Sequence, residues 1–312
     1  MIDKQASYTA ADTIPVKLFL NQGVPRLRPV HVQWMPTNAC NMQCDFCSCS
    51  ERNRSLEMPI DEALRVIGDF AQLGCKAVTI TGGGEPLMHP YITEMIEAFH
   101  EAGILVGLVT NGLLLDRLSQ KVIGLLTWCR ISNADNRTFS AGYRRILDRV
   151  TQVPIDWAFS HVVTSTPNLS EIVRVVKYAN KRAFTHVRLV GDLLEPEAVQ
   201  LGSVREVLQG IDQLVLYQPR KKFVRSGSCL IGYVKPVVAP DFKMYLCCGV
   251  QYATDPMNRD FPESLSMGSA RELGEVYGNP QPIAVNCVRC YYQNYNAVLR
   301  ALTSDIQHRE FV

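Results

Sequence analysis

Residues 31–47 read HVQWMPTNACNMQCDFC, a short apolar segment that runs directly into a loop with three cysteines. The segment 31–35 contains Val32 and Trp34, and both residue types are enriched in strands. The cysteines follow at positions 40, 44 and 47, in the spacing C-x3-C-x2-C. Reactive loops at the carboxyl ends of strands are typical of α/β proteins built on a parallel sheet.

Strand-like and helix-like segments alternate from this point to about residue 200, and this alternation predicts a parallel sheet with helices outside it. We expect strands at 31–35, 77–80, 104–109, 129–132, 157–163 and 186–190, and helices at 61–73, 91–100, 113–126, 139–150 and 170–182. A closed barrel of this kind needs eight strand–helix cycles. The six cycles expected here therefore predict an open, partial (β/α)6 TIM-like barrel of the α/β class.

The pattern changes near residue 200, where we place the end of the barrel. A strand-like segment at 233–238, a turn at 240–243 and a second segment at 244–246 predict a β-hairpin. A helical stretch is expected around 292–302. We therefore divide the chain into an N-terminal arm (1–28), the barrel (29–200) and a small cysteine-bearing domain of hairpin and helix (201–312).

Composition narrows the class of protein. Eleven cysteines and no apparent signal segment favour metal binding or catalysis over disulfides, because cytosolic thiols stay reduced. A net charge of +2 gives no support to a duplex nucleic acid partner. No apolar run is long enough to cross a bilayer, so we expect a cytoplasmic protein without a membrane partner.

The first cysteine cluster has the ligands for an iron–sulfur site. Three thiolates on one short loop can ligate three irons of a cubane cluster, which leaves a fourth iron open to a cofactor or substrate. The alternative is a structural zinc site, with Cys49 as a nearby fourth thiol.

Cys40, Cys44, Phe46 and Cys47 resemble the cluster motif of the radical S-adenosylmethionine (SAM) superfamily, C-x3-C-x-aromatic-C. The resemblance implies a [4Fe-4S] cluster whose open iron binds SAM. It also implies reductive cleavage of SAM to a 5′-deoxyadenosyl radical, which abstracts hydrogen from the substrate. A flavodoxin- or ferredoxin-type electron donor is the partner that this chemistry implies.

A Gly-rich turn follows the second expected strand and strengthens the resemblance. Residues 81–86 read TGGGEP, and Gly83, Gly84, Glu85 and Pro86 match the GGEP element whose backbone receives the SAM amino group in that family. A plain tight turn is the alternative, because glycine is common wherever the backbone takes unusual angles.

Further cofactor-binding positions are implied by the resemblance at the ends of later strands. Ser132 and Asp135 lie where the family places groups near the SAM carboxylate and ribose, and Asn111 matches its frequent T-N-G. Asn168 lies where relatives have an asparagine near the ribose, and Val190 could flank the adenine. Turn formation explains the two asparagines equally well, and core packing explains Val190.

A second group of thiols lies near the C-terminus. Cys229, Cys247, Cys287 and Cys290 suffice to close a cubane cluster fully. The segment from Cys229 to Cys247 resembles the start of the SPASM/Twitch extension, and the cysteine number fits the Twitch form with one auxiliary [4Fe-4S] cluster. Cys248 is an alternative ligand to Cys247, and a zinc knuckle is an alternative to the cluster.

An auxiliary cluster with four protein ligands has no open iron, so its expected role is electron transfer. The predicted reaction is therefore a two-electron oxidation, a dehydrogenation or a crosslink, of a small-molecule or peptide substrate. In layout the chain resembles radical SAM dehydrogenases of aminocyclitol biosynthesis and the shorter ribosomal-peptide maturases. The alternatives are a redox-neutral isomerase or epimerase, a peptide- or nucleotide-modifying enzyme, and a non-catalytic iron–sulfur or zinc protein.

Candidates for contact with the substrate come from the later strands. His161 and Arg188 are expected to face the barrel interior, and they are the candidate catalytic residues, since an oxidation needs a base for the departing proton. His89 and Asp192 lie near strand ends and are weaker candidates.

Overall fold

The computed structural model describes residues 27–134, 139–194, 201–218, 225–253 and 259–288, and residues 290, 292, 293, 295, 296 and 299. The N-terminal arm expected at 1–28 lies almost wholly outside the described residues. Most of the helix expected around 292–302 lies outside them as well.

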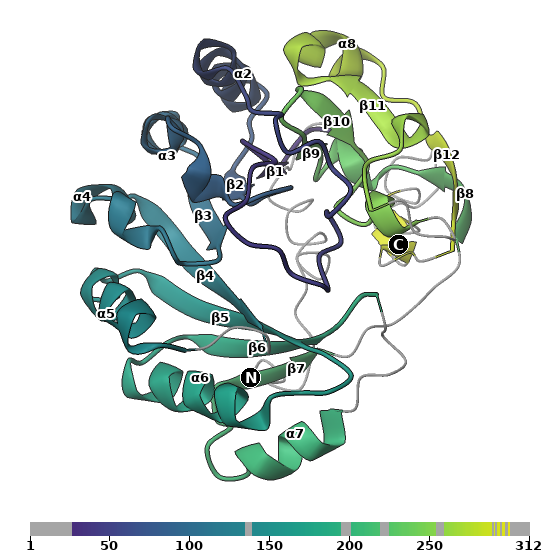
Figure 1. The fold of residues 1–312 in the computed structure, drawn as a ribbon. Helices are drawn as coiled ribbons and strands as arrows, with labels where there is room; N and C mark the ends of the chain where they lie inside the picture. The colour runs from purple at the N-terminus through teal and green to yellow at the C-terminus, as the bar shows by residue number, and fades with distance from the viewer. Residues whose placement is uncertain are drawn as a thin grey trace, which may run out of the picture.

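A curved sheet in which β1 to β7 follow chain order forms the body of the protein (Figure 1). Each neighbouring pair among its first seven strands is parallel. These strands are β1 His31–Trp34, β2 Ala77–Ile80, β3 Leu105–Thr110, β4 Leu126–Ala134, β5 Asp156–Val163, β6 His186–Gly191 and β7 Val215–Gln218. The α/β class and the open parallel barrel expected from the sequence are confirmed.

Helices cover the outer side of this sheet, and the cysteine loop after β1 lies on its inner side (Figure 1). Among the described residues, no helix combines the length and the apolar character needed to cross a bilayer. The helices are α2 Ile60–Gln72, α3 Ile92–Glu101, α4 Gln120–Ile123, α5 Ala141–Val150, α6 Leu169–Lys181 and α7 Leu201–Leu208. Short 3-10 turns connect several elements, at η1 Pro86–Met88, η2 Leu115–Arg117, η3 Ile231–Tyr233, η4 Val250–Tyr252, η5 Glu263–Leu265 and η6 Ala270–Glu272.

Two elements differ from the sequence-based expectation. A seventh parallel strand, β7, pairs with β6 beyond residue 200, and its four residues are too few to show a clear pattern. The single helix expected at 113–126 is instead the turn η2 followed by the short helix α4. Ser119 restarts the helix as its N-cap, because its hydroxyl accepts from the amide of Val122 at 3.2 Å.

The C-terminal hairpin extends the same sheet beyond β1. It consists of β9 Val237–Val238 and β10 Lys243–Tyr245, which pair antiparallel, and β11 Ser266–Ser269 adds to β10. The strand β9 pairs parallel with β1, with Gln33 opposite Val237. Helix α8 Leu273–Gly278 follows, and β8 Arg225–Cys229 pairs with β12 Ile283–Cys287 in a separate ribbon.

The two faces of the sheet carry different side chains. Phe159 of β5 is fully buried and stacks on Phe184 at 4.8 Å between ring centroids, against the helix layer. The next residue, Ser160, accepts a hydrogen bond from Arg188 of β6 at 3.1 Å on the opposite face. Because strand side chains alternate between faces, the inner face of β4 to β6 carries polar groups such as Ser160 and Arg188, and the outer face packs into the core.

Replacing Phe159 with Ala should lower the free energy of unfolding by about 3–5 kcal/mol, because the change removes packing and leaves a cavity. Urea denaturation followed by circular dichroism measures the difference. The matched control is Tyr91→Ala, since Tyr91 is 46% exposed and should lose less than about 1 kcal/mol. Equal losses in the two variants would contradict the placement of Phe159 in the core.

Candidate functional site

The three-cysteine loop closes on itself at the carboxyl end of β1. Thr37 and Glu57 form an isolated antiparallel bridge, and the amide of Asn38 donates to the carbonyl of Leu56 at 3.0 Å. The amide of Met58 donates to the carbonyl of Pro36 at 2.9 Å. These main-chain hydrogen bonds join the two ends of the loop and so hold the loop that carries the cysteines in place.

Cys40, Cys44 and Cys47 are partly exposed and near enough for their charges to interact. The amide of Cys47 donates to the carbonyl of Cys44 at 3.0 Å, which turns the loop between them. A hydrogen bond from the Cys49 thiol lowers the pKa of Cys47 to about 7, whereas burial raises the pKa of Cys40. The loop thus presents three thiols as a group, with Cys49 beside the third.

The Gly-rich turn after β2 packs directly against this loop. The amide of Gly84 donates to the carbonyl of Thr37 at 3.1 Å, and that of Glu85 donates to Ala39 at 2.8 Å. A β-carbon on Gly84 would lie 2.0 Å from the Ala39 oxygen, and one on Gly83 would lie 2.1 Å from Asn38 Oδ1. Glycine is therefore required at position 84, where the backbones of the two loops touch, and a side chain at position 83 would displace the Asn38 and Arg52 side chains.

The Glu85 carboxylate joins this turn to the next strand. Glu85 is 3% exposed, and its Oε1 accepts from the Leu87 amide at 3.1 Å and from the Thr110 hydroxyl at 2.6 Å. Its Oε2 accepts from the amide of Asn111 at 2.7 Å. The Glu85 side chain is therefore used within the protein, as are the amides of Gly84 and Glu85.

Asn111 completes the connection to the cysteine loop. Its Nδ2 donates to Asn41 Oδ1 at 2.7 Å, and its Oδ1 accepts from the amide of Leu113 at 3.0 Å. The ends of β1, β2 and β3 thus share one hydrogen-bonded rim. The alternative role that the sequence left open for Asn111, turn formation, is also present here.

The remaining residues predicted to bind the cofactor lie in different parts of the structure. Ser132 and Val190 lie on the inner face of β4 and β6, and Phe46 is partly buried in the cysteine loop. Asn168 is exposed and caps α6, because its Oδ1 accepts from the amide of Glu171 at 3.2 Å. Asp135 lies outside the described residues. Pro86 is buried and starts η1.

The two candidate catalytic residues lie on opposite faces of the sheet. His161 was expected to face the interior, but it lies on the outer face with Phe159 and is fully buried beside Asn133, 3.5 Å from its amide nitrogen. Arg188 does face the interior, where it donates to Ser160 at 3.1 Å. His89 is also fully buried, with Nε2 2.9 Å from the Met58 carbonyl.

A buried arginine that the sequence analysis did not identify connects the cysteine loop to the C-terminal region. Arg52 is 4% exposed, donates to Gln251 Oε1, and has its guanidinium 3.8 Å from the Phe261 ring centroid. Gln251 also donates to the Ser48 hydroxyl at 2.9 Å. No local pattern marks these residues, because the partners are far apart in the sequence.

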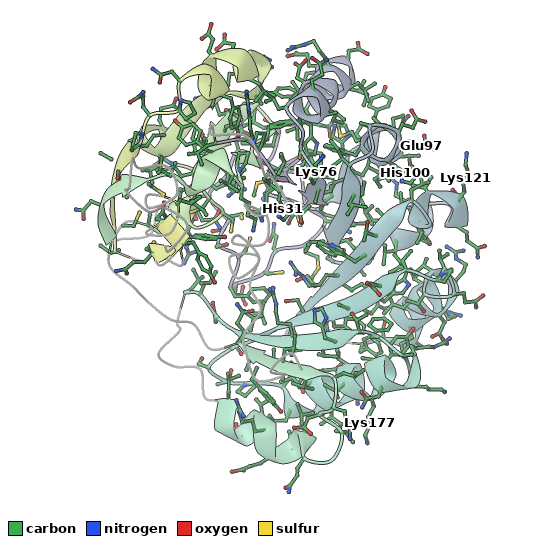
Figure 2. The ribbon with its side chains drawn as sticks, turned by 180° about the vertical axis from the view of Figure 1, so that it is seen from behind. His31, Lys76, Glu97, His100, Lys121 and Lys177 are labelled. Atoms are coloured by element: carbon green, nitrogen blue, oxygen red, sulfur yellow. The ribbon has the colours of Figure 1, made fainter. Side chains whose placement is uncertain are left out.

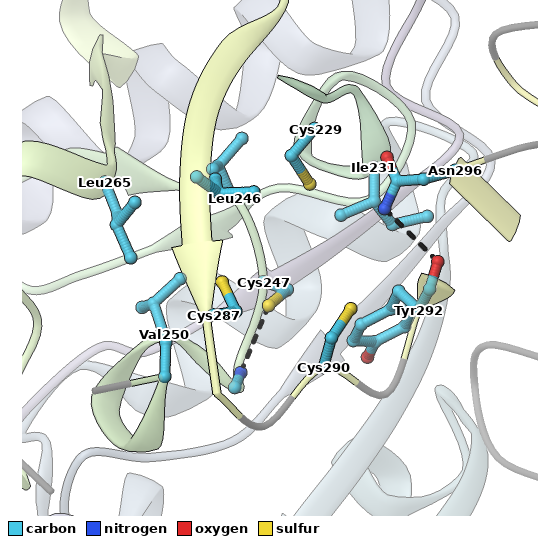
Figure 3. A pocket seen from close by; sticks show the side chains of 13 residues that line it. Cys229, Ile231, Leu246, Cys247, Val250, Leu265, Cys287, Cys290, Tyr292 and Asn296 are labelled. Carbon is cyan, nitrogen blue, oxygen red and sulfur yellow. Dashed lines mark hydrogen bonds between the residues drawn. The ribbon is translucent and has the colours of Figure 1, made fainter. Parts of the chain in front are cut away.

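The C-terminal cysteines surround one cavity. Cys229, Cys247, Cys287 and Cys290 line it, and Figure 3 shows their sulfur atoms facing it. Apolar residues form most of the remaining wall: Ile231, Leu246, Val250, Ala253, Leu265 and Val285. Four thiols around a mostly apolar cavity fit the ligand set of a fully ligated cubane cluster.

The Cys248 side chain lies outside the four-cysteine cavity. It is not among the residues that line the cavity, and its sulfur lies 3.6 Å from the Tyr292 hydroxyl. Cys247 lines the cavity, with its sulfur accepting from the amide of Gly249 at 3.3 Å. This geometry favours Cys247 as the ligand.

The sulfur arrangement also bears on the zinc alternative. Four thiolates are also the ligand set of a structural zinc ion, and the iron content after anaerobic reconstitution separates the two alternatives.

Comparison with known sequences identifies related proteins. The Radical SAM superfamily profile matches residues 34–129, which contain the cysteine loop and the Gly-rich turn. A GTP 3′,8-cyclase of Synechocystis sp. is 33% identical over 236 residues, 67% of this chain and 71% of that protein. A GTP 3′,8-cyclase of Tolumonas auensis is 29% identical over 185 residues, 58% of this chain. The chain spans only 49% of the Tolumonas protein.

Solved structures share the fold. Streptococcus suis SuiB bound to its precursor peptide SuiA superposes with a TM-score of 0.60 at 14% identity, covering 86% of this chain and 69% of SuiB. The enzyme anSMEcpe with bound AdoMet and a Cp18Cys peptide gives a TM-score of 0.57 at 13% identity, covering 90% and 84%. At these identities the likeness concerns the fold alone.

Glu85→Gln should destabilise the protein by roughly 1–3 kcal/mol, because the new amide group would face the Asn111 N–H, a donor against a donor. We also expect SAM to bind about tenfold more weakly, since the Gly-rich turn would shift. Thermal melts and equilibrium dialysis measure the two effects. Glu94→Gln, at an exposed position on α3, is the control, and similar behaviour of both variants would contradict the role given to Glu85.

Cys247→Ala and Cys248→Ala form a matched pair for the C-terminal cavity. We expect Cys247→Ala to reduce iron from about eight to about four atoms per chain after anaerobic reconstitution, and Cys248→Ala to keep about eight. Iron and protein assays on the same samples measure the ratio. The opposite result would assign the ligand to Cys248.

Proposed function

The chain belongs to the radical SAM superfamily, and we propose that it uses SAM cleavage to oxidise its substrate by two electrons, with a second iron–sulfur cluster as electron acceptor. Membership makes the protein an enzyme whose cofactors are a [4Fe-4S] cluster and SAM. The further claims concern the second cluster and the outcome of the reaction.

Cys40, Cys44 and Cys47 would ligate three irons of the first cluster, since their loop presents all three thiols at the rim of the barrel. Gly83 and Gly84 would offer backbone groups to the SAM amino acid portion, because the Glu85 carboxylate is already satisfied within the protein. When bound, the cluster and SAM supply hydrogen-atom abstraction from the substrate. The tight rim formed by β1, β2 and β3 would hold both cofactors in one orientation.

The observation that carries the oxidation proposal is the cavity lined by four cysteines. Four protein thiolates would leave no open iron for the substrate, so electron transfer is the chemistry that such a cluster can supply. In such an oxidation the substrate would lose a hydrogen atom, an electron and a proton. The bound SAM would accept the hydrogen atom, the second cluster would accept the electron and a base would accept the proton, while a flavodoxin- or ferredoxin-type donor would supply the electron for SAM cleavage.

The base is expected on the inner face of the barrel, where a substrate has access. Arg188 faces this space and would position the substrate rather than accept a proton, because a guanidinium stays protonated. His161 is buried in the core on the outer face of the sheet, so it is not the base. A small molecule or a peptide remains the proposed substrate class.

A second candidate function is a redox-neutral modification of a nucleotide. Its support is the similarity to two proteins named GTP 3′,8-cyclase, one of them matched over 71% of its length. The mass of the product separates the candidates, since a two-electron oxidation removes two hydrogen atoms from the substrate and a redox-neutral reaction removes none.

Replacing Cys40, Cys44 and Cys47 together with Ala should abolish formation of 5′-deoxyadenosine from SAM under anaerobic reduction, because no iron would remain to bind SAM. Liquid chromatography measures the product. The matched control is Cys75→Ala, since Cys75 is a buried core residue with its thiol 3.7 Å from the Val30 carbonyl. Retained cleavage in the triple variant would overturn the central assignment.

Replacing Cys287 and Cys290 with Ala should leave SAM cleavage measurable while iron falls to about four atoms per chain. If substrate oxidation also stops, the second cluster takes part in the reaction. Unchanged oxidation with half the iron would remove that cluster from the proposed function.

A further inference from the structure

A lysine is buried beside the four-cysteine cavity without a hydrogen-bonding partner. Lys235 lies between η3 and β9 and is 2% exposed, and its Nζ makes no hydrogen bond to the part of the chain that the structure describes. The ammonium lies 6.0 Å from the ring centroid of Tyr292, the outer limit for a cation–π contact. Burial lowers the pKa of Lys235, which is what an unpaired buried ammonium should show.

A second unpaired cation comes from β4. Arg130 alternates with Cys129 and Ile131, both fully buried in the outer core, so Arg130 faces the barrel interior. Its Nε is buried and makes no hydrogen bond within the described residues, and its guanidinium lies 5.4 Å from the Trp128 ring centroid. None of the ion pairs found among the described residues includes Arg130 or Lys235.

The two cations reach the same space from opposite walls. The sheet order runs β9-β1-β2-β3-β4, so three strands separate β4 from the strand that follows Lys235. Even so, Arg130 is near enough for its charge to lower the pKa of Lys235, while Cys248 and Cys247 are near enough to raise it. The curvature of the sheet brings these side chains toward one another across the interior.

The surrounding inner face adds positive charge. Arg188 of β6 faces the same interior, and burial together with Arg130 and Arg188 lowers the pKa of His186 to about 4. His186 is therefore neutral at physiological pH. The wall formed by β4 and β6 is cationic, and a ligand with negative charge would be attracted to it.

Burying a cation without a partner costs several kcal/mol, and a protein keeps such a group chiefly when a ligand completes it. We propose that Arg130 and Lys235 form an oxyanion subsite in the barrel interior, which binds a carboxylate or phosphate group of the substrate. This inference rests on the proposed function, because it assigns the substrate of that site to the class of anionic molecules. Arg130 supplies the planar fork suited to either group, and Lys235 supplies a point charge.

The subsite is separate from the groups that would hold SAM. Ser132 stands two residues nearer the strand end than Arg130, which is about 7 Å at the rise of an extended strand. The Gly-rich turn and the cysteine loop lie at the strand ends. The subsite thus lies deeper in the barrel, next to the four-cysteine cavity that Tyr292 also lines (Figure 3).

Anaerobic calorimetry on the full chain with both clusters reconstituted tests the subsite, with pyrophosphate, inorganic phosphate and succinate as probes. We expect saturable binding that weakens at least about tenfold in Arg130→Met and in Lys235→Met, since each removes a charged hydrogen-bond donor. Lys235→Arg should restore most of the affinity. The control is Lys177→Met, at an exposed site on α6 on the outer side of the sheet (Figure 2), which should bind as the wild type does.

The probes separate the two sources of the oxyanion. Tighter binding of pyrophosphate assigns the subsite to a phosphorylated substrate, and tighter binding of succinate assigns it to a carboxylic acid. A thermal melt gives an independent readout, because Lys235→Met should melt at a higher temperature than the wild type once the unpaired charge is gone.

Three results would overturn the inference: no saturable binding of any probe, equal binding by the wild type and both Met variants, or displacement of the probe by SAM. The last would assign the cations to the SAM carboxylate. SAM cleavage by the wild type is measured separately. SAM cleavage without anion binding would contradict the subsite alone. Anion binding without SAM cleavage would contradict the proposed function alone.

Discussion

Direct backbone contact between the Gly-rich turn and the three-cysteine loop is the constraint on which the rest of the site depends. The amide of Glu85 donates to the Ala39 carbonyl at 2.8 Å, and Gly84 leaves no room there for a β-carbon. Main-chain atoms therefore hold the cysteines against the ends of β1 and β2. The Glu85 carboxylate extends the constraint to β3 through the Asn111 amide. The strand ends and the cysteine loop form one hydrogen-bonded unit, and this is the preorganisation that a cofactor-dependent site needs.

Cofactor-binding loops and the proposed substrate-binding cations lie at different depths in the barrel. The loops that would hold the first cluster and SAM lie at the strand ends, where short turns can supply backbone groups. Arg130 lies further down β4, and Lys235 approaches from the other wall beside the four-cysteine cavity. Both buried charges reduce stability, and such a cost is typical of functional sites.

The sequence predicts the barrel and the cysteine loops because their signals are local: strand and helix periods, and motifs of four to eight residues. It does not predict the Arg52–Gln251 contact, whose partners are 199 residues apart. The face of His161 also escapes prediction, because a shift of one residue in a strand reverses the face of every side chain. The strand β7 is only four residues long, too short for a periodic pattern. Strand alternation around Cys129 and Ile131 is the signal that could have identified Arg130.

Electron paramagnetic resonance of the anaerobically reduced protein, recorded with and without SAM, tests the central claim most directly. Two clusters of different ligation should give two signals, and SAM should change only one of them, because only the cluster on Cys40, Cys44 and Cys47 would have an open iron. A single signal that SAM leaves unchanged, or a reduced protein with no cluster signal at all, would contradict the account.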